Sequence, residues 1–115
     1  MSLLSPGKSR AKVGFLVVDC QRRMIGFNPK FIDLWSIPKH LFVSRDDDHA
    51  LEFVSQQFKE PESFLFEVRE IYRHPDLVIY DTIKLKDGKI LERYSQPQLL
   101  EDKIVGRIWK FRQLV

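Results

Sequence analysis

Asp81 and Arg93 are the two residues of this 115-residue chain whose types and spacing point most directly to chemistry. They lie in neighbouring runs of β-branched and aromatic residues, separated by a short turn signal. If the two face each other on adjacent strands, Arg93 can hold a carboxylate or phosphate of a small molecule bidentately while Asp81 orients it. The alternative is an ion pair in which the two side chains only satisfy each other.

The turn between these two strands decides their register. A three-residue loop over residues 86–88, closed by a glycine in the left-handed conformation, places Asp81 opposite Arg93 and Ile79 opposite Ser95. A two-residue loop would set an isoleucine against a glutamate and mix an apolar face with a charged one. We therefore predict the three-residue loop, which gathers the charged pair and the serine on one otherwise apolar face.

A third run follows a second turn, so residues 77–111 are predicted to form a three-stranded antiparallel meander. Asp102 tolerates the left-handed conformation that the second turn requires. The apolar face then also receives Arg107, Trp109 and Phe111. Arg107 is either a third member of the charged group or a rim residue whose guanidinium reaches water.

The first third of the chain predicts two strands and a helix. The continuous apolar run at residues 13–19 is typical of a central strand that is buried on both faces, and residues 24–27 predict a second strand. Asn28 is a favourable helix N-cap, and the proline after it suits the first helical position. This helix carries apolar residues three and four apart and ends before Pro38.

Two further helices are predicted before the meander. The first is capped by Ser44 or by the aspartates at residues 46–48, and it buries Leu51, Val54 and Phe58. The second begins at a proline and ends at the next His-Pro pair. The predicted order β-β-α-α-α-β-β-β gives an α+β fold, with a five-stranded antiparallel sheet and helices covering one face.

Two segments of the chain resemble a known family. The series VGFLVVDCQRRMIGFNPKFIDLW is similar to the opening of a PAS domain, and KDGKILERYSQPQ followed by IVGRIWKFR is similar to its closing hairpin. The resemblance covers about residues 13–113. It implies the strand order 2-1-5-4-3 and a sensory or dimerisation module, usually one part of a larger signalling protein such as a histidine kinase or a cyclic-dinucleotide enzyme.

The chain also departs from the family pattern. Many PAS domains close with Asp-x-Thr after Phe-Arg, whereas here Phe111 and Arg112 are followed by Gln113, so coupling through that motif is not expected. The flavin-binding helix motif Asn-Cys-Arg-Phe-Leu-Gln is missing and Cys20 follows the first strand, so we expect no flavin adduct. His49 falls in an acidic first helical turn, where a solvated side chain is expected rather than a haem ligand. The sequence identifies no cofactor.

The face beneath the helices either fills with side chains as an ordinary core or keeps a cavity for a small apolar or aromatic molecule. The predicted pocket candidates are Trp35, Leu51, Val54, Phe58, Tyr72, Asp81, Arg93, Ser95, Arg107, Trp109 and Phe111. The predicted lining is completed by Phe31, Leu34, Val68 and Ile79.

The opposite face of the sheet is too apolar to be left wet in a monomer. Its dimer-face candidates are Phe15, Val17, Tyr80, Tyr94, Ile104 and Ile108. Either a flexible leader at residues 1–12 folds back over this face or a second copy packs on it. PAS relatives commonly use this face for dimers, and we favour a homodimer.

Length and composition favour a single domain over residues 13–115. The net charge is +3, but no basic stripe is interleaved with aromatics, so nucleic-acid binding is not expected. One cysteine excludes an intrachain disulfide and a multi-cysteine zinc site, and it suits the reducing cytoplasm. The three histidines lack a metal-binding spacing. No apolar run approaches the ~20 residues that span a bilayer, so no membrane insertion is expected.

These observations predict a sensory PAS module without catalysis of its own, whose effector domain lies elsewhere in a larger signal-transduction chain. It would bind a small molecule or a partner and relay the event by a conformational change. One alternative is a ligand-free PAS module that only dimerises. The other is a small α+β enzyme that uses Asp81 as a base. Ser95 lacks the histidine partner that a hydrolase needs.

Overall fold

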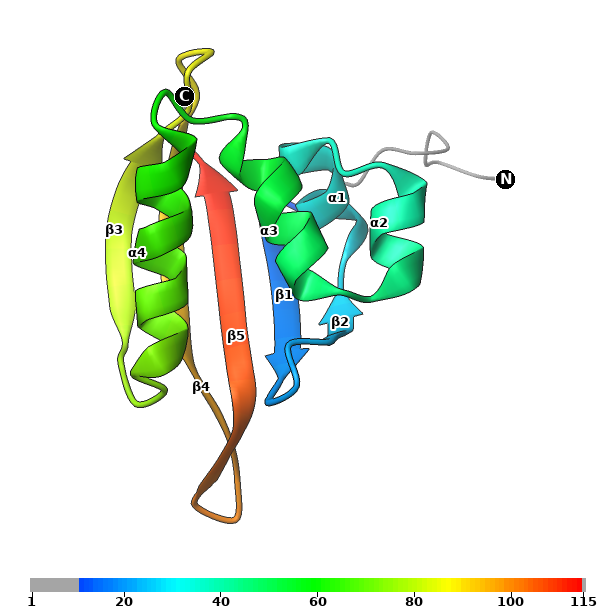
Figure 1. Ribbon diagram of the computed structural model, residues 1–115, viewed down its shortest axis with the longest axis vertical. Coiled ribbons are helices and arrows are strands. Elements are labelled where there is room, and N and C mark those ends of the chain that lie inside the picture. Colours follow the sequence, from blue (N-terminus) through cyan, green and yellow to red (C-terminus); the bar gives the residue numbers. More distant parts are fainter. Residues whose placement is uncertain (1–10, 115) are drawn as a thin grey trace.

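The computed structural model describes residues 11–114, so residues 1–10 of the predicted leader, and Val115, lie outside the described part. Figure 1 shows a sheet with the helices packed against one of its sides, which we call the inner face. The opposite side is called the outer face. In chain order the elements are β1 (Val13–Asp19), β2 (Met24–Phe27), α1 (Pro29–Trp35), α2 (Lys39–Ser44), α3 (Asp47–Ser55), α4 (Pro61–Arg73), β3 (Ile79–Lys84), β4 (Ile90–Leu100) and β5 (Lys103–Gln113).

The strands pair in the order β2-β1-β5-β4-β3, and neighbouring strands are antiparallel. This confirms the predicted five-stranded sheet. β3 and β4 pair Asp81 with Arg93 and Ile79 with Ser95, as the three-residue loop predicts. Gly88 closes that loop at a φ of 96°, in the left-handed region that glycine adopts without steric cost.

The hairpin of β4 and β5 has the longest strands and projects beyond the rest of the sheet (Figure 1). Its turn places Asp102 at a φ of 65°, which confirms the predicted left-handed aspartate, and Glu101 at 50°. Beyond the turn, Arg107, Trp109 and Phe111 alternate with outer-face residues and are buried on the inner face. The predicted face assignment of β5 is therefore confirmed.

Asn28 joins the start of α1 to β1. Its Oδ1 accepts hydrogen bonds from the backbone N–H groups of Phe31 (3.1 Å) and Phe15 (3.0 Å), and its Nδ2 donates to the carbonyl oxygen of Val13 (2.8 Å). The predicted N-cap is confirmed, and the same amide also satisfies backbone groups of the neighbouring strand. Entry into α1 is thereby fixed against the sheet.

The two later helices begin where the sequence predicts. Asp46 caps α3 by accepting from the backbone N–H groups of Asp48 (2.9 Å) and His49 (3.4 Å). α4 begins at Pro61 and ends at Arg73, before the His-Pro pair. α4 lies across β3, β4 and β5 in Figure 1, whereas α1 to α3 gather over β1 and β2.

Three details of the predicted secondary structure are wrong. The short helix α2 is not predicted, because its six residues are too few to show a helical period. Phe58 lies beyond the end of α3 and packs by stacking on Phe64, with ring centroids 3.9 Å apart. β1 is buried on its inner face only: Leu16 and Val18 are buried, whereas the outer-face residue Phe15 is exposed. β1 adjoins the edge strand, and the helices cover one side of it.

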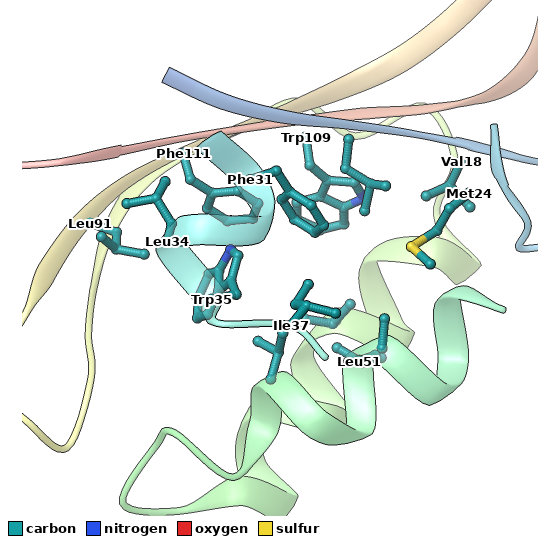
Figure 2. Close-up of a cluster of buried hydrophobic side chains, with 14 of the residues drawn as sticks. Val18, Met24, Phe31, Leu34, Trp35, Ile37, Leu51, Leu91, Trp109 and Phe111 are labelled. Atoms are coloured by element: carbon teal, nitrogen blue, oxygen red, sulfur yellow. The ribbon is translucent and has the colours of Figure 1, made fainter. Parts of the chain in front are cut away.

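The core lies between the helices and the inner face, as Figure 2 shows. Trp35, Met24 and Leu91 are essentially fully buried within it. Gly14 allows α1 to approach β1 closely, because a Cβ atom at this position would lie 2.8 Å from the backbone of Phe31. This close contact brings the aromatic side chains of α1 over the middle of the sheet.

Candidate functional site

A cavity of about 50 Å³ lies under the helices, and we call it the inner cavity. Figure 2 shows Phe31, Trp35, Leu51 and Trp109 around a common space. The walls are aliphatic or aromatic except for two charged residues and one tyrosine. The lining residues are Leu16, Phe31, Trp35, Asp47, Ala50, Leu51, Val54, Phe64, Val68, Tyr72, Arg93, Trp109 and Phe111.

Seven of the predicted pocket candidates line the inner cavity: Trp35, Leu51, Val54, Tyr72, Arg93, Trp109 and Phe111. The other four, Phe58, Asp81, Ser95 and Arg107, do not line it. Of the predicted completing residues, Phe31 and Val68 line it, whereas Leu34 and Ile79 do not. The sequence analysis missed Asp47 and Phe64 among others.

Arg93 is the buried cation of this site, with only 2% of its surface exposed. Its Nε donates to Asp81 Oδ1 at 2.9 Å and its Nη2 to Asp81 Oδ2 at 2.6 Å, while Nη2 also lies 2.6 Å from Glu67 Oε1 on α4. Burial lowers the pKa of the Arg93 guanidinium, but the two carboxylates outweigh it and raise that pKa overall. The third nitrogen, Nη1, is buried and has no hydrogen-bond partner among the described residues.

Asp81 forms the predicted pair but is not itself buried, since 44% of its side chain is exposed. The pair therefore runs from the inner cavity, where Arg93 lies, to the solvent at the edge strand β3. Glu67 extends the pair to α4. Glu67 was not predicted, because a lone glutamate on the exposed side of a helix is ordinarily a solvated residue.

Arg107 and Ser95 form a separate group beside the inner cavity. Arg107 Nη1 donates to Ser95 Oγ at 2.8 Å, and Nη2 donates to the carbonyl oxygens of Pro75 (3.0 Å) and Leu77 (2.8 Å). Ser95 Oγ in turn donates to the carbonyl oxygen of Ile108 at 2.9 Å. Arg107 thus joins the loop after α4 to the sheet and does not contact the Asp81–Arg93 pair.

Arg107 also borders a wider groove of about 510 Å³ near the β1–β2 turn, together with Arg22, Arg69 and Arg73. Each of these three other arginines is already paired with a carboxylate on α3 or α4, at 2.8 to 3.4 Å. Their charge is therefore largely balanced within the protein. We assign no ligand to this groove.

A second buried network, which also lines the inner cavity, was not predicted. Asp47 is 5% exposed and accepts hydrogen bonds at Oδ2 from Arg22 Nε (2.9 Å), Arg22 Nη2 (2.8 Å) and the Tyr72 hydroxyl (3.1 Å). Tyr72 accepts in turn from Trp109 Nε1 at 2.9 Å, and the Arg22 guanidinium lies 3.8 Å from the centre of the Tyr72 ring. The network joins the β1–β2 turn, α3, α4 and β5.

The helical spacing of Asp47 indicates a buried residue, although the run of three aspartates around it suggests a solvated one. Asp47 precedes Ala50 by three residues, Leu51 by four and Val54 by seven, so it belongs to the buried stripe of α3. Burial raises the pKa of the Asp47 carboxyl, although Arg22 opposes this effect. Burial also raises the Tyr72 pKa far above its usual value, so its hydroxyl remains a neutral donor at physiological pH.

We expect Tyr72→Phe to lower the free energy of unfolding by about 2 kcal/mol, because the buried Trp109 N–H loses its acceptor. Urea unfolding followed by tryptophan fluorescence measures the loss. Tyr94→Phe is the matched control: its hydroxyl bonds Gln96 at 2.7 Å on the half-buried outer face, and its loss should stay below about 0.5 kcal/mol. Equal losses in the two variants would contradict the buried role of Tyr72.

The sequence matches no family model and no curated protein. Among solved structures, a PAS domain from Colwellia psychrerythraea superposes with a TM-score of 0.55 at 18% identity, over 90% of this chain and 87% of that one. The sensor region of a sensor histidine kinase gives a TM-score of 0.66 at 13% identity, over 96% of this chain and 42% of that one. The chain therefore spans less than half of that sensor region.

A third similar structure is the PAS domain of a LuxR-family transcriptional regulator from Burkholderia thailandensis, in complex with ethanol. Its TM-score is 0.51 at 11% identity, over 91% of each chain. All three superpose on this chain over 90% or more of its length. This chain has the PAS fold. At these identities the similarity establishes the PAS architecture and leaves the site to be argued from its own residues.

The outer face of this PAS sheet carries a row of exposed and half-buried apolar side chains. Tyr80 is 69% exposed, Phe15 38% and Ile104 36%, while Val17, Tyr94 and Ile108 are half-buried. The six predicted dimer-face candidates thus lie on strands β1, β3, β4 and β5, on the side of the sheet away from the helices. The expectation that the leader covers this face falls on residues 1–10, outside the described part.

Glu92 connects three strands on the outer face of the PAS sheet. It accepts from the Tyr80 hydroxyl on β3 at 2.8 Å and from Arg112 on β5 at 3.1 and 3.0 Å. These contacts hold the pKa of the Glu92 carboxyl below its usual range, and the hydrogen bond from Tyr80 has the largest effect. The pKa of Glu92 is therefore lower in the folded protein than in the unfolded chain. The contacts of Glu92 stabilise the fold at pH values above the pKa of the unfolded state, and this stabilisation is lost as the pH falls through the pKa of the folded state.

We expect Tyr80→Phe to raise the pKa of Glu92 toward its ordinary value, since the first of these hydrogen bonds disappears while Arg112 remains. An NMR titration of the Glu92 side-chain carboxyl carbon between pH 2 and 6 measures the change. Tyr94→Phe leaves both contacts of Glu92 in place and should leave the titration unchanged. A Glu92 pKa that is identical in Tyr80→Phe and the unmodified protein would contradict this assignment.

Two negative findings concern the described residues. No group of three or more histidine, cysteine or acidic side chains within residues 11–114 is arranged to hold a metal ion. No helix in the same range is long and apolar enough to cross a membrane.

Proposed function

We propose that this chain is the sensory PAS module of a larger signal-transduction protein, and that it binds a small molecule in the inner cavity. The observation that carries the proposal is the cavity itself, an apolar space beneath the helices with the buried side chain of Arg93 in its wall. Arg93 pairs with Asp81 and Glu67, and its Nη1 has no hydrogen-bond partner among the described residues.

The similar structures support this proposal in two ways. One is the sensor region of a histidine kinase, and another is a PAS domain that holds ethanol, a molecule of three heavy atoms. A small cavity is therefore compatible with ligand binding on this fold. We further propose that the effector domain lies elsewhere in the full-length chain, that the module has no catalysis of its own, and that it works in the cytoplasm, where the free thiol of Cys20 stays reduced.

Native mass spectrometry together with an absorption spectrum tests the sensory proposal on the purified protein. A protein mass increased by a non-covalent ligand that dissociates on activation supports it. A visible absorption band would identify the chemical class of that ligand. Protein that binds no small molecule, either after purification or after exposure to a library of small compounds, would overturn it in favour of a module that only dimerises.

We also propose that two copies associate through the outer face. Its exposed aromatic and aliphatic residues on four strands support a partner there. Ligand-induced changes in the sheet would then reach the second copy directly, because the same strands carry the inner cavity on one side and the partner on the other. A dimer that binds nothing remains the second candidate function, favoured by the same exposed face.

Tyr80→Lys tests the dimer, with Phe66→Lys as its matched control. Tyr80 and Phe66 are 69% and 68% exposed, but Phe66 lies on α4, away from the outer face. We expect Tyr80→Lys to weaken dimerisation at least tenfold, which corresponds to about 1.4 kcal/mol, and Phe66→Lys to leave it unchanged. Analytical ultracentrifugation measures both dissociation constants. A monomer in the unmodified protein would exclude the proposed dimer.

A further inference from the structure

We infer that the inner cavity takes a small apolar molecule, such as a light hydrocarbon, and that the protein forms no hydrogen bond to it. The inference rests on the proposed function, because it names the class of molecule that the sensory cavity binds. It follows from the state of the polar groups in the cavity wall, from the apolar groups between them and from the volume of the space.

The polar groups of Trp109, Tyr72 and Asp47 in the cavity wall bind one another. The indole N–H of Trp109 donates to the Tyr72 hydroxyl at 2.9 Å, and that hydroxyl donates to Asp47 Oδ2 at 3.1 Å. Asp47 also accepts two hydrogen bonds from Arg22, at 2.8 and 2.9 Å, and this guanidinium balances its charge. A ligand therefore finds neither a free donor nor an unbalanced charge at these residues.

The other two polar side chains of the wall, Arg93 and Trp35, are closed to a ligand. Nε and Nη2 of Arg93 bind the carboxylates of Asp81 and Glu67. Arg93 Nη1 and Trp35 Nε1 have no hydrogen-bond partner among the described residues, yet both nitrogens are enclosed by protein atoms. A molecule in the cavity does not reach them, so neither residue gives a polar ligand a partner.

Apolar groups from four elements complete the wall. Leu51 belongs to α3, Val68 to α4, Phe31 to α1 and Trp109 to β5. Figure 2 shows Phe31, Leu51 and Trp109 around the common space. A hydrocarbon in this space gains dispersion contacts with all four elements at once. A molecule with a hydroxyl or carbonyl group would lose the hydration of that group without a matching hydrogen bond.

The volume of the inner cavity limits the size of the ligand. About 50 Å³ is several times the ~10–15 Å³ that one water molecule needs, and about a third of the ~150 Å³ of an apolar cavity that binds benzene. The cavity therefore admits about two to four heavy atoms and excludes an aromatic ring. Of the small apolar or aromatic molecules that the sequence allows, only those without an aromatic ring fit.

Propane, dimethyl ether and ethanol, each with three heavy atoms, separate the possible ligand classes. Propane has no polar atom, dimethyl ether has an acceptor, and ethanol also has a hydroxyl that could donate to Asp47. Each is titrated into the methyl-labelled protein at pH 7, and shifts are followed at Leu51, Val54 and Val68, with the exposed Leu99 as control. We expect saturable shifts with propane and about tenfold weaker binding, or weaker still, of the other two, because each buries an unpaired oxygen.

Val54→Ile and Val43→Ile are a matched pair of variants. Val54 lines the cavity, so an added methyl group takes up part of the space, whereas Val43 is exposed on α2. We expect Val54→Ile to weaken propane binding about fivefold or more and Val43→Ile to leave it unchanged. Val54→Ala enlarges the cavity and should bind n-pentane more tightly than the unmodified protein does. This variant keeps the test decisive where the larger side chain of Val54→Ile disturbs the fold.

The outcomes are distinct. Binding of dimethyl ether or ethanol as tight as that of propane would overturn the apolar class while leaving a ligand-binding cavity, and a preference for ethanol would identify Asp47 as an acceptor. Propane binding that is the same in all the variants would place the ligand outside the inner cavity. Binding of none of the three would overturn both the inference and the proposed sensory function. Preferred binding of propane that Val54→Ile weakens supports the inference.

Discussion

Replacing Gly106 with alanine is expected to cost about 3 kcal/mol or more and to leave a large fraction of the protein unfolded. A Cβ atom at Gly106 would collide with the carbonyl oxygen of Val18, and it would lie 3.1 Å from the Cα atom of Asp19. Both are backbone atoms of β1, the strand paired with β5 at this point. A side-chain rotation cannot relieve the contact, so the two central strands must separate.

Gly26→Ala is the matched control for this substitution. Gly26 also lies in the sheet, on β2, but its added Cβ atom would meet only the Val17 side chain at 3.7 Å, an ordinary contact. Its effect should stay within about 0.5 kcal/mol in either direction. Thermal unfolding by circular dichroism compares the two variants. If Gly106→Ala melted within a few degrees of Gly26→Ala, the close approach of β5 to β1 would be wrong.

The second large effect is expected at Asp47. Asp47→Ala should lower the free energy of unfolding by about 3 kcal/mol, because it leaves the Arg22 guanidinium and the Tyr72 hydroxyl without their shared acceptor. Asp48→Ala is the control from the same first turn of α3. Asp48 is 42% exposed, and its loss, chiefly of a contact with Arg69 at 3.3 Å, should cost less than about 1 kcal/mol.

Each variant removes one acidic residue from the first turn of α3, so both lose a similar interaction with the helix dipole. The difference between their free energies of unfolding therefore measures the effect of the buried contacts of Asp47. Urea unfolding at pH 7 gives both free energies. A double-mutant cycle of Asp47→Ala with Arg22→Ala should show a coupling of about 2 kcal/mol. A cost for Asp48→Ala equal to that for Asp47→Ala would show that the Asp47 network adds nothing beyond its charge.

The sheet could be predicted from the sequence because its constraints are local and periodic. A glycine-closed loop and the alternation of residues along two strands are enough to place Asp81 opposite Arg93. Turn chemistry likewise placed Asp102, and capping chemistry placed Asn28. Each of these depends on a few residues that are close in the sequence.

The site could be predicted only in part because its decisive contacts join distant elements. Glu67 reaches Arg93 from a helix face that looks solvated in the sequence. Asp47 is one of three consecutive aspartates, and this acidic run hides the helical spacing that places it on the buried stripe of α3. Arg107 has the same face and the same chemistry as Arg93, yet it bonds backbone carbonyls after α4. Periodicity assigns a face but does not choose partners on it.

The hydrogen bonds of Asn28 have a consequence for hydrogen exchange and for force transmission. The amide protons of Phe15 and Phe31, far apart in the sequence, share one acceptor atom, so opening the N-terminal end of β1 exposes the first turn of α1 at the same time. Phe31 also forms part of the inner cavity wall. A displacement of the chain just before Val13 is therefore carried through a single side-chain amide to the wall of the inner cavity.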